Sequence, residues 1–214
     1  MSNIAIHEIY CSLQGESTYA GWPCVFVRTG GCDIRCTYCD EPAALAAGSS
    51  MSLDDVIARV REFGAPLVEL TGGEPLLQPA APELARRLLE LGYEVLIETG
   101  GHRDISVLDP RVRVILDVKT PGSRMLKQND WANLERLQPG AEIKFVLCDE
   151  DDYVWAREQV RERGLAQRAP VHFSPVHGRV DPKDLAAWIL RDKLNVRLNL
   201  QLHKYIWGAD AKSV

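Results

Sequence analysis

Short apolar segments alternate along the chain with longer segments in which apolar residues recur every three or four positions. The short segments predict β-strands and the longer ones predict helices. A first strand ends near Leu13, and the later strands are predicted over 25–28, 66–70, 94–97, 112–118, 142–147, 171–173 and 196–200. The helices are predicted over about 52–64, 82–91, 130–137, 150–163 and 182–191. Residues 100–109 and 120–128 are too irregular to predict helices.

Strands that alternate with helices indicate βα units and a mainly parallel sheet. The chain holds too few of these units for a full eight-fold barrel, which needs ~250 residues. We therefore predict an α/β fold, an open and partial βα barrel with about six parallel strands. No linker, repeat or low-complexity segment divides the sequence, so we expect residues 1–214 to form one domain.

Composition and charge narrow the class of protein. Hydrophobic residues make up 46% of the chain, which is enough for a sizeable core, and the net charge is −5. That charge argues against binding to nucleic acid or to an anionic membrane. No apolar run approaches the ~20 residues that span a bilayer, and the first residues lack the features of a signal peptide. We expect a cytoplasmic protein whose cysteines are thiols or metal ligands rather than disulfides.

Three cysteines form a cluster with the spacing CxxxCxxC, at Cys32, Cys36 and Cys39. A structural zinc site usually has four ligands, and no fourth Cys or His lies nearby in the sequence. Three thiolates can instead hold three corners of a [4Fe–4S] cluster and leave one iron open to a small molecule. A zinc loop completed by a distant residue, or a chance cluster, stays open as an alternative. The other cysteines are expected to be small buried hydrophobic side chains: Cys11, Cys24 and Cys148.

Polar and glycine-rich segments follow most of the predicted parallel strands, at the ends where ligands collect in such folds. The cysteine loop follows strand 25–28, and Thr71-Gly-Gly-Glu-Pro75 follows the next strand. Later strands are followed by 98–101, by Lys119 and by 174–175. We therefore expect all of them to open on one rim.

Within the segment 71–75, the two glycines would let the backbone approach a ligand closely. Glu74 would offer an acceptor for an ammonium group. An ordinary βα turn would use the same residue types, so this segment alone is a moderate signal.

The cysteine triplet, with Tyr38 just before its last cysteine, resembles the signature of the radical S-adenosylmethionine (SAM) enzymes. Thr71-Gly-Gly-Glu-Pro75 resembles the motif with which that superfamily binds the amino group of SAM. Leu13-Gln-Gly-Glu16, Glu98-Thr-Gly-Gly101 and His203-Lys-Tyr205 narrow the match. Taken singly, residues 14–16 could be a surface turn, His203 a buried core histidine and Lys204 a solvent-exposed charge. Together, over residues 8 to about 207, the sequence resembles the 7-carboxy-7-deazaguanine synthase family.

The resemblance implies a reaction and its participants. The substrate would be 6-carboxy-5,6,7,8-tetrahydropterin, and the cofactors a [4Fe–4S] cluster and SAM. A reduced cluster would cleave SAM to a 5′-deoxyadenosyl radical, which takes a hydrogen from C6 of the pterin. The ring then contracts, ammonia is lost and SAM is regenerated. The family also implies a reducing partner such as flavodoxin or ferredoxin, and a homodimer.

The resemblance also assigns roles to residues. Those expected to bind the substrate are Leu13, Gln14, Gly15, Glu16, Arg28, Thr71 and His203. Those expected to lie near SAM are Tyr38, Gly72, Gly73, Glu74, Lys119 and Ser174, with the rest of 174–177. Gln14 can donate and accept hydrogen bonds, and Glu16 can accept them. Arg28 can clamp a carboxylate through two bonds, as an anchor rather than a proton-transfer group.

The sequence departs from the family pattern just after Asp40. A typical member carries Thr or Ser at the next position, whose hydroxyl binds a Mg²⁺ that also contacts the substrate carboxylate. This chain has Glu41 followed by Pro42. Asp40 and Glu41 could form a Mg²⁺ site in which Glu41 binds the metal directly, or Glu41 could swing away from the site or face solvent. We predict that the requirement for Mg²⁺ is weakened or lost. A glutamate in place of Thr or Ser has a longer side chain and a negative charge, and Mg²⁺ demands near-ideal ligand geometry.

Two other functions stay open at this stage. Small activases of glycyl-radical enzymes share the cysteine motif and a partial barrel, but act on a protein. The segments 13–16 and 203–205 argue against that function. The second alternative is an iron–sulfur or zinc module without catalysis, for which the segment 71–75 would have no purpose.

Overall fold

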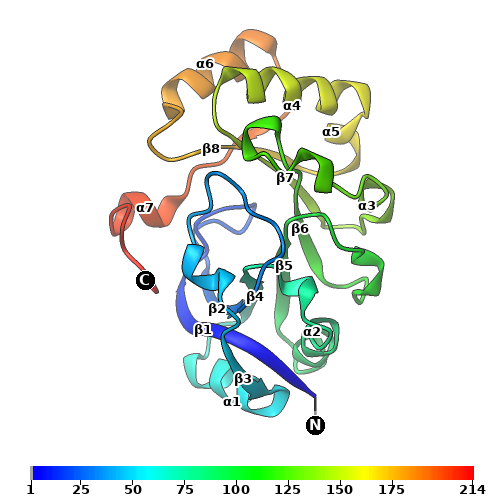
Figure 1. The fold of residues 1–214 in the computed structure, drawn as a ribbon, viewed down its shortest axis with the longest axis vertical. Helices are drawn as coiled ribbons and strands as arrows, with labels where there is room; N and C mark the ends of the chain where they lie inside the picture. Colours follow the sequence, from blue (N-terminus) through cyan, green and yellow to red (C-terminus); the bar gives the residue numbers. More distant parts are fainter. Residues whose placement is uncertain (1) are drawn as a thin grey trace.

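The computed structural model describes residues 2–214. Within them, nine strands form one sheet in the order β3-β1-β2-β4-β5-β6-β7-β8-β9 (Figure 1). The strands that run parallel are β2 (Pro23–Thr29), β4 (Leu67–Gly72), β5 (Glu94–Thr99), β6 (Arg113–Asp117), β7 (Glu142–Leu147), β8 (Val171–Pro175) and β9 (Arg197–Leu198). Two antiparallel strands, β1 (Asn3–Leu13) and β3 (Ser49–Ser52), extend one edge. The sheet stays open between β3 and β9, so the predicted partial barrel is confirmed.

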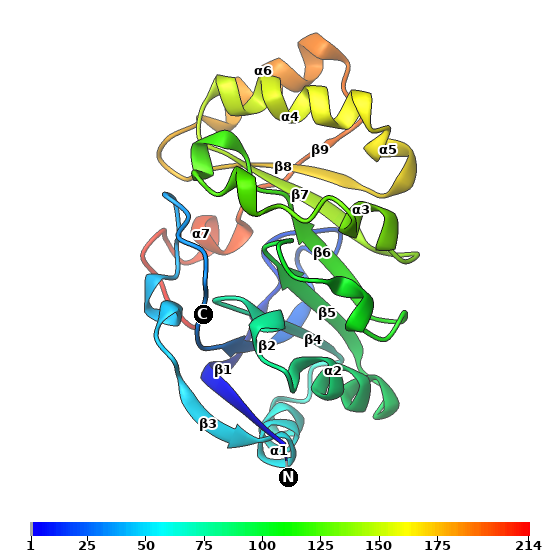
Figure 2. The same cartoon turned by 45° about the vertical axis from the view of Figure 1, so that its right-hand side comes forward.

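Helices surround the curved sheet on its outer side (Figure 2). The longer ones are α1 (Leu53–Phe63), α2 (Ala81–Glu90), α4 (Glu150–Glu162) and α6 (Pro182–Asp192). The short ones are α3 (Asn133–Arg136) and α5 (Leu165–Arg168), whereas α7 (Leu202–Ile206) has no buried residue and lies beside the cavity described below. Within residues 2–214, none has the length and apolar character needed to cross a membrane.

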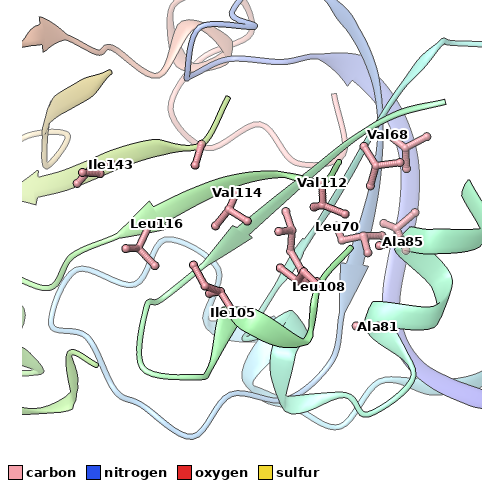
Figure 3. Packing of buried hydrophobic residues seen from close by; sticks show 14 of the residues in the cluster. Val68, Leu70, Ala81, Ala85, Ile105, Leu108, Val112, Val114, Leu116 and Ile143 are labelled. Atoms are coloured by element: carbon pink, nitrogen blue, oxygen red, sulfur yellow. The ribbon is translucent and has the colours of Figure 1, made fainter. Parts of the chain in front are cut away.

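The main hydrophobic core lies between the sheet and these helices. Val68 and Leu70 of β4 face Ala81 and Ala85 of α2 across this layer, and all four side chains are buried (Figure 3). Burying apolar surface here is the main force that holds the helices on the sheet. The opposite face of the strands is left for the site.

Local signals set several boundaries. The side chain of Ser52 accepts a hydrogen bond from the backbone N–H of Asp55 at 3.1 Å, which caps the start of α1. Gly64 ends that helix with a φ of 70°, a conformation that glycine adopts without steric cost. The α6 helix begins at Pro182, with Asp181 as its capping residue.

Two predicted elements are shorter than expected. The helix predicted over 130–137 is only the single turn α3, because the side chain of Asn133 bonds to the backbones of Ile105 and Arg103 and holds this segment as a loop. The last strand shrinks from 196–200 to β9, which pairs only with two residues of β8. The irregular segments 100–109 and 120–128 hold only short 3-10 turns, as expected.

Candidate active site

A cavity of about 440 Å³ opens at the carboxyl ends of the parallel strands. Every residue that the sequence predicted for the site lines it. The group comprises Leu13, Gln14, Gly15, Glu16, Arg28, Cys32, Cys36, Tyr38, Cys39, Asp40, Glu41, Thr71, Gly72, Gly73, Glu74, Lys119, Ser174 and His203. The volume suits a small-molecule site. Their placement on one rim is confirmed, whereas the role of each residue stays a prediction.

The cysteine loop leaves β2 and is held both by a neighbouring segment and by a bond within itself. The Thr37 hydroxyl donates to the Gly122 carbonyl at 2.7 Å, and within the loop the Arg35 guanidinium donates to the Cys32 carbonyl at 2.7 Å. All three thiols of the motif are free. Three free thiols on one loop that lines the cavity suit a cubane cluster, which would take each thiolate on a different iron.

Lys119, directly after β6, places a buried positive charge beside the cysteine loop. Its ammonium donates to Asp117 at 2.7 Å and lies 5.9 Å from the ring centre of Tyr38. Burial by itself lowers the pKa of Lys119, but the charge and hydrogen bond of Asp117, together with Tyr38 and Cys36, outweigh burial and keep the pKa well above 10.5. The Tyr38 hydroxyl and Asp117 Oδ1 are buried without a hydrogen-bond partner in the described part of the chain. Both line the cavity, so they suit contacts with a polar cofactor.

Glu74 is buried and already bonded within the protein, contrary to the simple expectation of a free acceptor. One of its carboxylate oxygens accepts from the Thr99 hydroxyl at 2.8 Å and from the Leu76 N–H at 3.0 Å. The other accepts from the Gly100 N–H at 2.8 Å. A carboxylate has about four acceptor positions, so roughly one is left for a ligand. Through these bonds Glu74 joins the loops after β4 and β5, and its contact with a ligand stays a prediction.

The two glycines before Glu74 are also explained by packing. A side chain at Gly72, whose φ is 139°, would collide with the backbone of Thr29. A side chain at Gly73 would collide with the carbonyl of Gly31. The end of β2 and the start of the cysteine loop therefore pack directly against these glycines. Close packing of the protein backbone is a second reason for both glycines, and their approach to a ligand stays a prediction.

The other side of the cavity is built by β1, β2 and the segment after β9. Arg28 donates from Nε to Glu8 at 2.8 Å and from a terminal nitrogen to the Tyr10 hydroxyl at 3.1 Å. The Leu202 N–H donates to the Gly15 carbonyl at 2.8 Å, and a side chain at Gly15 would collide with the His203 ring. The loop after β1 and the start of α7 therefore form one wall.

Gln14 stabilises that wall through two hydrogen bonds. Its amide oxygen accepts from the Glu16 N–H at 2.7 Å, and its amide nitrogen donates to the buried carboxyl of Glu69. Gln14 is itself buried, so it orients the loop that presents Glu16 to the cavity.

A buried cluster of charges forms the floor of the cavity. The Lys144 ammonium on β7 lies 2.5 Å from a Glu16 carboxylate oxygen and 2.6 Å from a Glu98 carboxylate oxygen. Burial alone lowers the pKa of Lys144, but these two carboxylates keep it well above 10.5, so Lys144 stays charged. Burial raises the pKa of Glu69 above 4.5, and the nearby Glu98 and Glu16 charges raise it further.

Replacing Glu69 with glutamine should therefore stabilise the protein relative to wild type as pH rises. A carboxyl whose pKa is raised by folding stabilises the folded state fully below its ordinary value of 4.5, and this contribution is lost as pH rises through the folded pKa. Glutamine keeps an acceptor for Gln14 and cannot ionise. Thermal unfolding of both proteins at several pH values measures the difference. The matched control is Glu83→Gln on the surface of α2, where the pKa is lowered by Arg86. A Glu69→Gln difference that stays constant with pH would contradict the expectation.

Known proteins share this sequence over nearly its whole length. The radical SAM superfamily model matches residues 26–138. A 7-carboxy-7-deazaguanine synthase from Chlorobaculum tepidum is 46% identical, over 98% of this chain and 96% of that protein. Another from Koribacter versatilis is also 46% identical, over 98% of this chain and 99% of that protein. The chain belongs to the 7-carboxy-7-deazaguanine synthase family.

Solved structures share the fold of this family member. The crystal structure of QueE from Escherichia coli has a TM-score of 0.76 at 24% identity, and covers 94% of this chain and 95% of that one. The crystal structure of SuiB from Streptococcus suis with its precursor peptide has a TM-score of 0.59 at 13% identity, over 82% of this chain and 47% of that one.

Membership of the 7-carboxy-7-deazaguanine synthase family makes the chain a radical SAM lyase of 7-deazapurine biosynthesis, with a small-molecule substrate. It also implies a [4Fe–4S] cluster and SAM as cofactors. The activase and the non-catalytic module are set aside.

The position that the family uses for Mg²⁺ is filled differently here. Glu41 neither faces solvent nor points at an open metal position. Its carboxylate accepts from the Lys212 ammonium at 3.1 Å, and the same ammonium lies 2.9 Å from the Asp40 carbonyl oxygen. Asp40 also accepts from the Gln201 amide at 3.1 Å. An ammonium group beside these oxygens does not fit a Mg²⁺ ion bound to them.

Several cavity residues were not found from the sequence. They are Glu69, Lys144, Asn199, Gln201 and Lys212. For two of them a signal was present, because Glu69 and Lys144 are charged residues inside short apolar strands. Such residues are rarely buried unless they are paired. Lys212 carries no comparable signal, since nothing near it in the sequence marks it as different from a surface lysine.

Proposed function

We propose that this chain converts 6-carboxy-5,6,7,8-tetrahydropterin into 7-carboxy-7-deazaguanine in the cavity described above. The observation that carries the proposal is the convergence of the segments 13–16, 32–39, 71–74 and 203–204 on one cavity. These segments are far apart in the sequence, and each matches the family at the expected position. A single sheet and one main core extend through residues 4–189, which supports one radical SAM domain.

In this proposal, the cysteine thiolates hold the cluster, and the residues around 71–74 and Tyr38 hold SAM. When bound, these groups supply the radical that removes hydrogen from the substrate. The protein binds and orients the cofactors and the substrate, and it shields them from water. The positive charge of Lys119 stabilises negative charge on the cysteine thiolates nearby. The Tyr38 hydroxyl and Asp117 Oδ1 have no hydrogen-bond partner among the described residues, so they suit contacts with SAM.

Residues of the opposite wall would hold the pterin. Arg28 would bind the substrate carboxylate, with Glu8 and Tyr10 fixing the orientation of its guanidinium. Glu16 would accept hydrogen bonds from the ring N–H groups while Lys144 holds its carboxylate in place. Because Lys144 also holds Glu98, it sets the position of two acidic groups beneath the ring. Fixed groups in a site that excludes water are worth more than the same groups in solvent.

The proposal includes a small acidic electron carrier, such as flavodoxin or ferredoxin, as the reducing partner. Exposed arginines surround the cysteine loop although the chain as a whole is acidic: Arg35, Arg124 and Arg179. These exposed positive charges would attract an acidic protein toward the cluster. We also propose a cytoplasmic homodimer, as the family suggests, which a sizing column tests.

One experiment tests the function. The protein is reconstituted anaerobically with iron and sulfide, then given reductant, SAM and the carboxypterin. We expect 7-carboxy-7-deazaguanine as the product. The absence of this product, together with formation of 5′-deoxyadenosine against a glycyl-radical partner, would reject the proposal in favour of an activase.

Removal of divalent ions should change turnover little. The Lys212 ammonium already neutralises Glu41, so no charge at this corner requires a metal ion. The measurement is the rate of product formation after EDTA treatment and gel filtration of the reconstituted protein, with the cluster absorbance recorded as a control. A large drop in rate that added Mg²⁺ restores would refute this and identify Glu41 as a ligand. Glu41→Thr would then show whether the carboxylate or only the position matters.

A further inference from the structure

The segment after α7 returns across the mouth of the cavity. Residues 209–214 line it, and in both views this end of the chain lies beside β1 and the cysteine loop (Figures 1 and 2). Lys212 contacts the Asp40 carbonyl oxygen at 2.9 Å and the Glu41 carboxylate at 3.1 Å. The next residue, Ser213, donates from its hydroxyl to Glu8 at 2.5 Å. We call residues 209–213 the strap.

The strap is connected to the anchor for the substrate. Glu8 accepts from Ser213 with one carboxylate oxygen and from Arg28 with the other. Lys212 holds the strap to the loop after Cys39, and Glu8 joins the strap to the wall that carries Arg28. The strap therefore contacts the same carboxylate that orients the Arg28 guanidinium.

The Lys212 ammonium also decides what else can bind at this corner. A Mg²⁺ ion needs oxygen ligands at 2.0–2.1 Å in an octahedral arrangement. The Asp40 carbonyl oxygen and a Glu41 carboxylate oxygen could begin such a shell, but both already accept from Lys212. The Lys212 ammonium and a Mg²⁺ ion would also repel each other. The Glu41 side chain is only 15% exposed, so it has little freedom to turn toward a second cation.

We propose that Lys212 is a tethered cation that replaces a metal ion at the Asp40–Glu41 corner and fastens the strap over the bound substrate. This rests on the proposed function, because it places an anionic pterin below the strap. Lys212 and Arg28, each paired with a carboxylate of the protein, then place two cationic hydrogen-bond donors on one side of the cavity, and the substrate carboxylate meets donors that the protein carries itself. Lys212 is a specificity-determining residue rather than a catalytic one.

The first test measures metal binding without substrate. Mn²⁺, which replaces Mg²⁺ in most sites, is titrated into the reconstituted protein with its cluster in the oxidised, diamagnetic state, and free Mn²⁺ is read by its EPR signal. We expect no loss of free Mn²⁺ that depends on Glu41 in wild type. We expect a new site in Lys212→Ala, which the double variant Lys212→Ala/Glu41→Gln abolishes. A wild-type Mn²⁺ site that Glu41→Gln removes would overturn the proposal.

The second test measures the affinity for the carboxypterin and for SAM separately. Lys212→Ala should weaken pterin binding by about tenfold or more, as expected when one hydrogen bond to a charged group is lost, and should leave SAM binding unchanged. Lys212→Arg should recover most of the loss. The matched control is Lys183→Ala, an exposed lysine on α6 outside the cavity. Unchanged pterin affinity in Lys212→Ala would overturn the proposal.

The two tests separate this inference from the proposed function. Mn²⁺ binding is read without any substrate, so it reports on Lys212 even if the pterin is not turned over. Conversely, product formation by a wild-type enzyme that binds Mn²⁺ through Glu41 would reject the tethered cation and leave the proposed function standing.

Discussion

Replacing any one of Cys32, Cys36 or Cys39 with alanine should abolish the broad iron–sulfur absorbance of the reconstituted protein, or all cleavage of SAM. Each thiolate would hold a different iron, and among the described residues no other cysteine lies on this loop to take its place. A cluster with two protein ligands is open to solvent and oxidants. Absorbance and iron content measure the first effect, and formation of 5′-deoxyadenosine measures the second.

Cys148 offers a matched control for this result. It is buried, and its environment includes Gly122 and Asp152 directly beneath Thr37 of the cysteine loop. Burial raises the pKa of the Cys148 thiol to about 11, with a further contribution from Asp152, and Cys148 lies outside the cysteine loop. Cys148→Ala should leave the absorbance and SAM cleavage intact. Loss of the cluster in this variant would show that the ligand set was misidentified.

Arg28→Ala should weaken binding of the carboxypterin by roughly 100-fold, while SAM binding is preserved. Removing one partner of a largely buried ion pair costs about 3 kcal/mol, because the other charge is left without compensation. Here both the substrate carboxylate and Glu8 would lose their partner, since Arg28 holds Glu8 at 2.8 Å. A cost of that size corresponds to roughly two orders of magnitude in Kd. Equilibrium binding of each ligand to the reconstituted protein measures the effect.

Two further variants separate the substrate contact from the structural one. Arg28→Lys keeps the charge but not the two-pronged geometry, so it should recover only part of the affinity. Arg28→Ala/Glu8→Gln removes the unpaired carboxylate, and a remaining deficit in pterin affinity then belongs to the lost substrate contact. Equal loss of SAM and pterin affinity in Arg28→Ala would reject the assigned role.

The sequence predicts those parts of the molecule that depend on local patterns. The buried strand β4 is visible because Leu67, Val68 and Leu70 form a short apolar run that ends at glycine. Ser52 and Gly64 mark the ends of α1 in the same way. The convergence of the site follows from topology, because the carboxyl ends of parallel strands meet at one rim.

Contacts between distant parts of the chain are not visible in this way. The bonds of Lys212 to Asp40 and Glu41 span more than 170 residues, and no local pattern specifies them. The helix predicted over 130–137 was shortened by the side chain of Asn133, which bonds about 30 residues away. The reason for Gly73 was also hidden, since the atom it makes room for belongs to Gly31.

The wall formed by Gly15 and Leu202 also bears on how the protein folds. The bond between these residues closes a loop of nearly the whole chain, and Gln201 joins Glu16 across a similar separation. Closing long loops delays folding more than it weakens the folded state, because the entropy of closure grows slowly with length but must be overcome before the contacts form. Helices and neighbouring strands can form as they are synthesised, whereas this wall must wait for residues 199–204. The cavity is therefore without this wall until late in folding, so its substrate side is the last part of the site to be completed.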